Sequence, residues 1–136
     1  MTMPLMRPKR KNPVLRTRLP TLPPGQRGRV ALGMTAAALM GMNNVWYPFV
    51  EMADDADLKT QQAQLRMNAY ATNGGVDKRR FEMYALSASI IGKCHFCIKS
   101  HYELLRKEGM STTQLRDVGR IAAVVNAASQ VIEASA

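Results

Sequence analysis

Long apolar runs are absent from this sequence of 136 residues, although 46% of its residues are hydrophobic. No stretch approaches the roughly 20 apolar residues of a membrane-spanning helix, and no secretory apolar core follows the basic N-terminal residues. We therefore expect a cytoplasmic protein with no part in the membrane. A chain of this length suits one compact hydrophobic core and is short for two independent cores.

Acidic and aromatic residues are absent from the first 30 positions, which hold eight of the 19 Lys and Arg and six of the seven prolines. Such a segment buries too little apolar surface to order itself, so we expect residues 1–29 to be a flexible basic arm. Binding of nucleic acid or membrane would need stacking aromatic residues or an apolar helical face beside the charges, and the arm has neither. The remaining residues carry eleven positive and ten negative charges, so the net charge of +9 does not describe the folded part.

Alternating β-branched runs are scarce as well, whereas apolar residues recur at helical spacing from residue 30 onward. The sequence therefore predicts an all-α domain over residues 30–136, with about five helices and no strand. The expected helices cover residues 30–44, 59–71, 78–91 and 94–108, and a last one begins at residue 111. In the last helix an apolar face is expected to turn to the core: Leu115, Val118, Ala122, Val125, Ser129 and Ile132.

The helix ends carry recognisable signals. Asp77 can cap the third helix, and Ser111 with Gln114 has the spacing of a capping box before the last one. The first helix is expected to close at Asn43 and Asn44, before a loop that contains Pro48. Its methionines are interpreted as core filler, so no heme or copper site is expected.

Only two cysteines are present, Cys94 and Cys97, and His101 follows four residues after the second. A pair at this spacing can pass between dithiol and disulfide with little disturbance of the fold. Such a pair usually occurs in a thioredoxin fold, but the missing β-α-β pattern excludes that fold here. At the start of a helix, free amide N–H groups and the positive end of the dipole favour the thiolate. One turn later on the same face, His101 is within reach of Cys97.

Glu82 is the only charged residue in the stretch 81–91, which is otherwise apolar or small. A buried carboxylate is costly without a partner, and a histidine that takes a proton from a thiol is one such partner. The residues therefore predict a relay. Glu82 orients His101, His101 activates one thiol, and the second thiol resolves the product.

The same residues admit plainer interpretations. The two cysteines can be idle core side chains, and His101 can be an ordinary core or interface histidine. Glu82 can form a salt bridge with Lys78 or Arg80 at the helix start. A zinc site would draw on the two cysteines, His101 and His95, but these lie on little more than two turns of one helix and lack a second ligand pair. We predict no metal site.

Three segments resemble the alkylhydroperoxidases of the AhpD type, within the carboxymuconolactone decarboxylase-like superfamily. They read ALGMTAAALMGMNNVWY at residues 31–47, LRMN at 65–68 and FEMYALSASIIGKCHFCIKSHYELLRKEGMS at 81–111. The likeness covers about residues 30–136. Its most specific element is the combined spacing of Glu82, Cys94, Cys97 and His101.

The resemblance implies an antioxidant enzyme that reduces alkyl hydroperoxides and forms a disulfide between Cys94 and Cys97. Cys97 would attack the peroxide and become a sulfenic acid, and Cys94 would donate a proton and then resolve it. His101 would act as base, with Glu82 relaying its proton. No cofactor is expected to be bound, because the dihydrolipoyl group of a lipoylated partner protein supplies the electrons. A peroxiredoxin is a second implied partner, and the implied assembly is a homotrimer.

Two departures from the family pattern bear on these expectations. Family members often carry a histidine directly before the second cysteine, whereas this chain has His95 and Phe96 between its cysteines, so the role of His95 stays open. Family members also carry further helices before the region of likeness, where this chain has the basic arm. Uncovered apolar surface is then expected, with a weakened trimer or another oligomer. Two other functions stay open: a non-enzymatic redox-responsive interaction protein, and a truncated family member with impaired activity.

Overall fold

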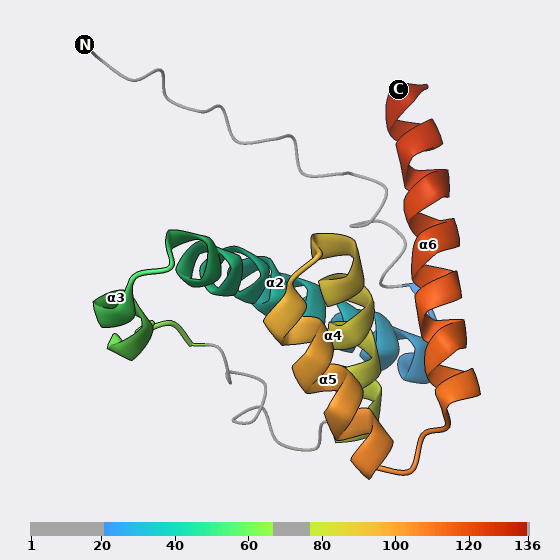
Figure 1. The fold of residues 1–136 in the computed structure, drawn as a ribbon. Helices are drawn as coiled ribbons and strands as arrows, with labels where there is room; N and C mark the ends of the chain where they lie inside the picture. Colours follow the sequence, from blue (N-terminus) through green and yellow to red (C-terminus); the bar gives the residue numbers. More distant parts are fainter. Residues whose placement is uncertain (1–20, 67–76, 136) are drawn as a thin grey trace. The chain divides into compact units, whose positions relative to one another are not determined.

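The structure, a computed structural model, describes residues 21–66 and 77–135. Within these ranges the chain forms five α-helices and no strand, which confirms the predicted all-α class (Figure 1). The helices are α2 (Pro24–Ala53), α3 (Ala56–Thr60), α4 (Lys78–Gly92), α5 (His95–Lys107) and α6 (Thr112–Ala134). None of them is long and apolar enough to cross a membrane.

Contacts between residues divide the chain into two units, residues 1–31 and residues 32–136. Most of the arm predicted over residues 1–29 lies outside the described residues. Its last part is helical, because α2 begins at Pro24 and not at residue 30. Proline is well suited to the first helical turn, where its missing N–H would have no partner in any case. The core and the site described below belong to the second unit.

Helix α2 also runs further toward the C-terminus than predicted. It continues past Asn43 and Asn44 and through Pro48 to Ala53, so the helix end and the loop expected there are wrong. Proline inside a helix removes a hydrogen bond. Two contacts with α5 flank the proline, since Tyr47 stacks on Phe96 and Glu51 pairs with His95.

Helix α3 is much shorter than the predicted helix over residues 59–71. It covers Ala56–Thr60, and the carboxylate of Asp55 caps it by accepting the Leu58 amide at 2.7 Å. Gln61 is extended (φ −73°, ψ 138°) and Gln64 has a φ of +51°, so the backbone leaves the helical conformation there. The remainder of that predicted helix, from residue 67, lies outside the described residues.

The helices predicted around the cysteines are confirmed. The Asp77 carboxylate caps α4 by accepting the Arg80 amide at 3.1 Å, as predicted. α4 packs against both α5 and α6. Two apolar clusters form the core around α4: Ala36, Leu39, Met40, Phe81 and Ala85 toward α2, and Leu86, Leu105, Met110 and Leu115 toward α5 and α6.

Helix α6 begins as predicted, with the Ser111 and Gln114 capping box formed in both directions. Its expected core face is buried only in the first half. Leu115 and Ala122 are buried, but Val125 and Ile132 are 60% and 69% exposed, so the prediction is wrong for these two residues. Helix α6 has 23 residues and α4, on which it packs, has 15, so the end of α6 with Ile132 is left uncovered. Val125 is exposed for another reason, because it lines an open pocket between the two helices.

Candidate functional site

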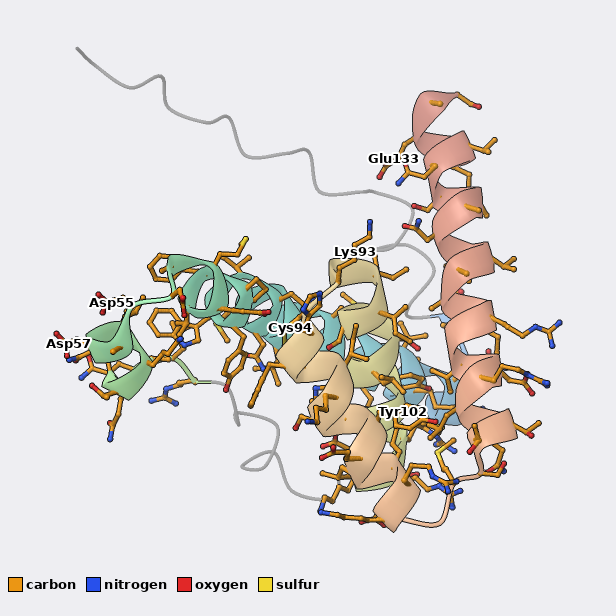
Figure 2. The ribbon with its side chains drawn as sticks, viewed as in Figure 1. Asp55, Asp57, Lys93, Cys94, Tyr102 and Glu133 are labelled. Carbon is orange, nitrogen blue, oxygen red and sulfur yellow. A yellow bond between two sulfur atoms is a disulfide. The ribbon has the colours of Figure 1, made fainter. Side chains whose placement is uncertain are left out.

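Cys94 lies at the junction of α4 and α5 (Figure 2), and Cys97 follows in the first turn of α5. Lys93 adopts the left-handed conformation (φ 54°, ψ 34°) that ends α4, and Cys94 is the N-cap of α5. Gly92 lets α2 approach this turn, since an added Cβ would lie 2.6 Å from Cγ of Asn44. The turn therefore depends on a glycine, a left-handed residue and a cysteine cap in succession.

A disulfide joins Cys94 and Cys97, with Cα atoms 5.3 Å apart. Both residues are buried, with exposed fractions of 0% and 2%. The amide of Cys97 donates to Sγ of Cys94 at 3.3 Å, the N-cap interaction in which Ser or Asp oxygens usually accept. An amide donor and a helix N-terminus at Sγ of Cys94 stabilise the thiolate that this residue becomes when it gives up its proton.

Glu82 and His101 meet across the α4–α5 interface. Oε2 of Glu82 lies 2.5 Å from Nδ1 of His101, with the two side chains 3% and 14% exposed. A carboxylate only accepts hydrogen bonds, so it holds the imidazole proton on Nδ1. The neutral ring then has its lone pair on Nε2, which is the arrangement of a general base.

Helix α2 supplies the other contacts of the site. Sδ of Met40 lies 3.2 Å from Nε2 of His101, and the Asn43 side-chain amide lies 4.0 Å from the same sulfur. The backbone oxygen of Asn43 is 3.9 Å from Sγ of Cys94. Met40 and Asn43 therefore connect the histidine to the disulfide.

The two residues between the cysteines both contact the end of α2. Nδ1 of His95 lies 3.2 Å from Oε1 of Glu51, and both side chains are exposed. Phe96 stacks on Tyr47 with ring centroids 4.3 Å apart. His95 thus points to a surface carboxylate. No group of three or more His, Cys, Asp or Glu side chains in residues 21–66 and 77–135 is arranged to hold a metal ion.

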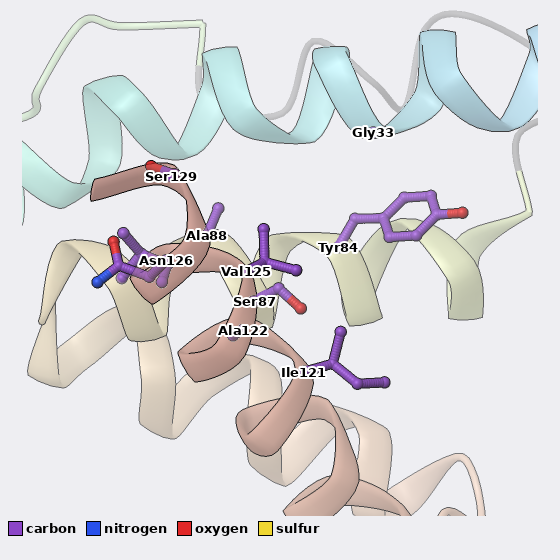
Figure 3. Close-up of a pocket in the computed structure, with 10 residues that line it drawn as sticks. Gly33, Tyr84, Ser87, Ala88, Ile121, Ala122, Val125, Asn126 and Ser129 are labelled. Carbon is purple, nitrogen blue, oxygen red and sulfur yellow. The ribbon is translucent and has the colours of Figure 1, made fainter. Parts of the chain in front are cut away.

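A cavity of about 400 Å³ lies elsewhere, between α4 and α6 (Figure 3). Its lining is mostly apolar and includes Tyr84, Ala88, Ile121 and Val125. No cysteine, histidine or carboxylate lines it, so it cannot be the place of thiol chemistry. The chemistry of the described residues is concentrated at the α4–α5 junction.

Comparison with known proteins shows the family to which the chain belongs. Residues 56–136 match the carboxymuconolactone decarboxylase family. The chain belongs to this family. Alkyl hydroperoxide reductase AhpD of Maricaulis maris is 50% identical over 99 residues, which cover 73% of this chain and 57% of that protein. The protein of the same name from Rhodospirillum centenum is 44% identical over 110 residues, 78% of this chain and 59% of that protein. The chain thus spans less than two thirds of the length of these relatives.

In this member of the carboxymuconolactone decarboxylase family, the structure brings together the predicted Glu82 and His101, and it joins Cys94 to Cys97. The ring nitrogens of His101 face Glu82 and Met40, and neither is hydrogen-bonded to Cys97 in this disulfide state. Sequence reasoning missed the part that Met40 takes. A buried methionine on an alanine-rich helix resembles ordinary core filler, and only the packing of α2 on α5 distinguishes it.

Proposed function

We propose that this protein is a thiol-dependent hydroperoxide reductase that acts on alkyl hydroperoxides through Cys94 and Cys97. The contact between buried Glu82 and His101, one turn along α5 from a cysteine pair, carries the proposal. It supplies a base where thiol chemistry needs one. The relatives named alkyl hydroperoxide reductase AhpD support the choice of substrate.

In the first step the thiolate of Cys97 attacks the distal oxygen of the hydroperoxide. The O–O bond breaks, Cys97 becomes a sulfenic acid, and the alkoxide leaves as an alcohol with a proton from Cys94. His101 takes the proton of the Cys97 thiol beforehand through Nε2, while Glu82 holds Nδ1 and stabilises the imidazolium. The one-turn spacing of Cys97 and His101 on α5 supports this assignment.

In the second step Sγ of Cys94 attacks Sγ of the sulfenic acid. The S–O bond breaks, the hydroxide takes back the proton held by His101 and leaves as water, and the product is the Cys94–Cys97 disulfide, the state that the structure holds. Two thiols are oxidised and one hydroperoxide is reduced to alcohol and water. A sulfenic acid beside a second thiol condenses readily, so further oxidation of Cys97 is suppressed.

The dihydrolipoyl group of a lipoylated protein then reduces the disulfide by two thiol exchanges and becomes a lipoyl disulfide. No bound cofactor is required. Both sulfur atoms are buried, so the start of α5 must open for this exchange. In this proposal the reaction takes place in the cytoplasm, and the enzyme can also regenerate a peroxiredoxin.

Steady-state turnover with tert-butyl hydroperoxide and dihydrolipoamide tests the proposal on the full chain. The wild type should consume the hydroperoxide, and Cys97→Ser should abolish turnover because the nucleophile is lost. Ser100→Ala, at an exposed position of the same helix, serves as the matched control and should keep the rate. Absence of turnover in the wild type would contradict the proposal and leave the two alternatives, a non-enzymatic redox-responsive protein and a truncated family member with impaired activity.

The homotrimer stays a prediction. Exposed apolar residues on α6, among them Val124, Val131 and Ile132, offer surface for an oligomer contact. Size-exclusion chromatography with light scattering measures the assembly. A mass of three chains would support the trimer, and a monomer or another oligomer would agree with the weakened assembly expected from the sequence.

A further inference from the structure

Met40 places a reduced sulfur atom at the reactive end of His101. Its Sδ is 3.2 Å from Nε2, the nitrogen that the proposed reaction uses. A thioether has no hydrogen to donate, so it leaves a lone pair on Nε2 without a hydrogen bond. The proposed function assigns no step to Met40, although no other thioether of the described residues has a recorded contact with His101.

The oxidation state of the two cysteines determines which sulfur atom a hydroperoxide can oxidise at this site. While they are reduced, the thiolate of Cys97 is the strongest nucleophile present. In the disulfide state, which the structure shows, neither sulfur is a thiolate. The chain has no third cysteine, so the Met40 thioether is then the reducing sulfur beside His101.

Solvent exposure does not favour Cys97 over Met40 as the target of a hydroperoxide. Met40 and Cys97 have the same exposed fraction, 2% each. Asn43 contacts both Met40 and the other cysteine of the disulfide, with its side chain 4.0 Å from Sδ of Met40 and its backbone oxygen 3.9 Å from Sγ of Cys94. An opening that admits a hydroperoxide to the cysteine pair therefore brings it close to Met40.

We infer that Met40 is a site of oxidation by the hydroperoxide itself, which inactivates the protein when peroxide arrives before the disulfide has been reduced. This inference rests on the proposed function for the source of its oxidant. The thioether attacks the O–O bond, the distal oxygen is transferred to sulfur, and the products are methionine sulfoxide and the alcohol. No further reductant or oxidant is required.

The sulfoxide changes the environment of His101. Its oxygen is a strong acceptor, and it replaces a weak one at the position that faces Nε2. A proton on Nε2 is then held by the sulfoxide while Glu82 holds the proton on Nδ1. The imidazole can no longer take the proton of the Cys97 thiol, so peroxide reduction stops even after the disulfide is reopened.

Peptide mass spectrometry of the full chain in its disulfide form tests the modification. The protein is treated with tert-butyl hydroperoxide without reductant, and sulfoxide formation is followed at each methionine. Met52 and Met34 are the internal comparisons, because they are 78% and 50% exposed. Exposure alone predicts that both react far faster than Met40. The inference predicts that Met40 reacts at least as fast as Met52 in folded protein. Any difference between the oxidation rates of the two residues should disappear in protein unfolded in guanidinium.

The functional consequence is measured on the same samples after reduction of the disulfide. In the wild type the lost fraction of turnover should match the oxidised fraction of Met40. Met40→Leu, which keeps the volume and has no sulfur, should retain its own untreated activity through the same exposure. Met42→Leu, on the same helix, is the matched control and should be inactivated as the wild type is.

Two results would overturn the inference. One is an unmodified Met40 in folded protein whose Met52 is oxidised, and the other is oxidised Met40 with full retention of turnover. The mass measurement does not depend on turnover. Failure of the proposed function would appear as a lack of activity in every untreated sample, whereas failure of this inference would appear in the sulfoxide pattern.

Discussion

Helices α4 and α5 differ sharply from the C-terminal half of α6 in what covers their apolar residues. Phe81, Leu86 and Leu105 on the first pair are at most 1% exposed, and the cysteines and Glu82 are buried among them. On α6, Val131 and Ile132 are 67% and 69% exposed. The surrounding core therefore holds the site in place, whereas the C-terminal half of α6 depends for its stability mainly on capping and helix propensity.

The contrast extends to the polar groups. Between α4 and α5, the buried carboxylate of Glu82 has a partner in His101. On α6 the charged residues pair at the surface, as Arg116 and Arg120 do with Asp117. A surface ion pair contributes little to the free energy of unfolding, whereas loss of one member of a buried pair strongly destabilises the protein. Changes in the two regions should therefore differ in size and in what they affect.

The largest expected effect concerns the two histidines. His101→Gln should lower turnover by about 10²- to 10⁴-fold, because the proposed reaction loses its general base. His95→Gln removes the other histidine, whose contact with Glu51 lies at the surface, and should leave turnover near the wild-type rate. Steady-state kinetics with circular dichroism on both variants makes the comparison. Equal losses would show that a histidine near the cysteines is required only for folding.

Truncation of a core side chain is expected to have the next largest effect, and it compares the stability contributions of the two regions directly. Phe81→Ala should lower the free energy of unfolding by about 3–5 kcal/mol, since the ring is fully buried. Ile132→Ala on the exposed part of α6 should change it by about 0.5 kcal/mol or less. Urea unfolding measures both variants. A large loss at Ile132 would mean that an oligomer contact covers α6 in solution.

A smaller effect is expected at the close approach of α2 to the cysteine turn. Gly92→Ala brings a Cβ against Asn44, which should cost about 1–3 kcal/mol in unfolding free energy and displace the turn before Cys94. Gly41→Ala is the matched control, because nothing lies within 4 Å of its added Cβ. In the middle of α2 it should stabilise by roughly 0.5–1 kcal/mol. Indistinguishable stabilities would contradict the packing described for this turn.

The smallest effect concerns the start of α6. Ser111→Ala removes the hydroxyl that accepts the Gln114 amide, and should cost about 1 kcal/mol. Thr113→Ala, two residues further on, removes a hydroxyl for which no capping contact is recorded. Thermal unfolding followed by circular dichroism compares the two. A larger loss at Thr113 would place the helix start elsewhere.

The success of the sequence in predicting the fold depended on the kind of signal. Caps with a physical mechanism, at Asp77 and Ser111, placed the starts of α4 and α6 correctly. Asn43 and Asn44 were misread as a helix end and Pro48 as part of a loop, because the contacts made by α2 there come from α5, far along the chain. The exposed half of α6 was misread for a related reason. Periodicity shows which face is apolar, and says nothing about the length of the helix that covers it.

The candidate site could be predicted to the extent that its residues lie on α4 and α5. A lone carboxylate in an apolar helix indicated Glu82, and one helical turn connected the cysteines with His101. Met40 could not be found in this way, because its importance comes from its contact with His101, 61 positions later in the sequence. Contacts across that separation depend on tertiary packing, which spacing along one helix does not encode.

A single-turnover measurement tests the central claim most directly. The full chain is reduced, freed of reductant and mixed with one equivalent of alkyl hydroperoxide, and alcohol, free thiols and the disulfide are quantified together. The account predicts one alcohol formed for every two thiols lost, with Cys94 and Cys97 joined in the product. Intact hydroperoxide beside two retained thiols would contradict it.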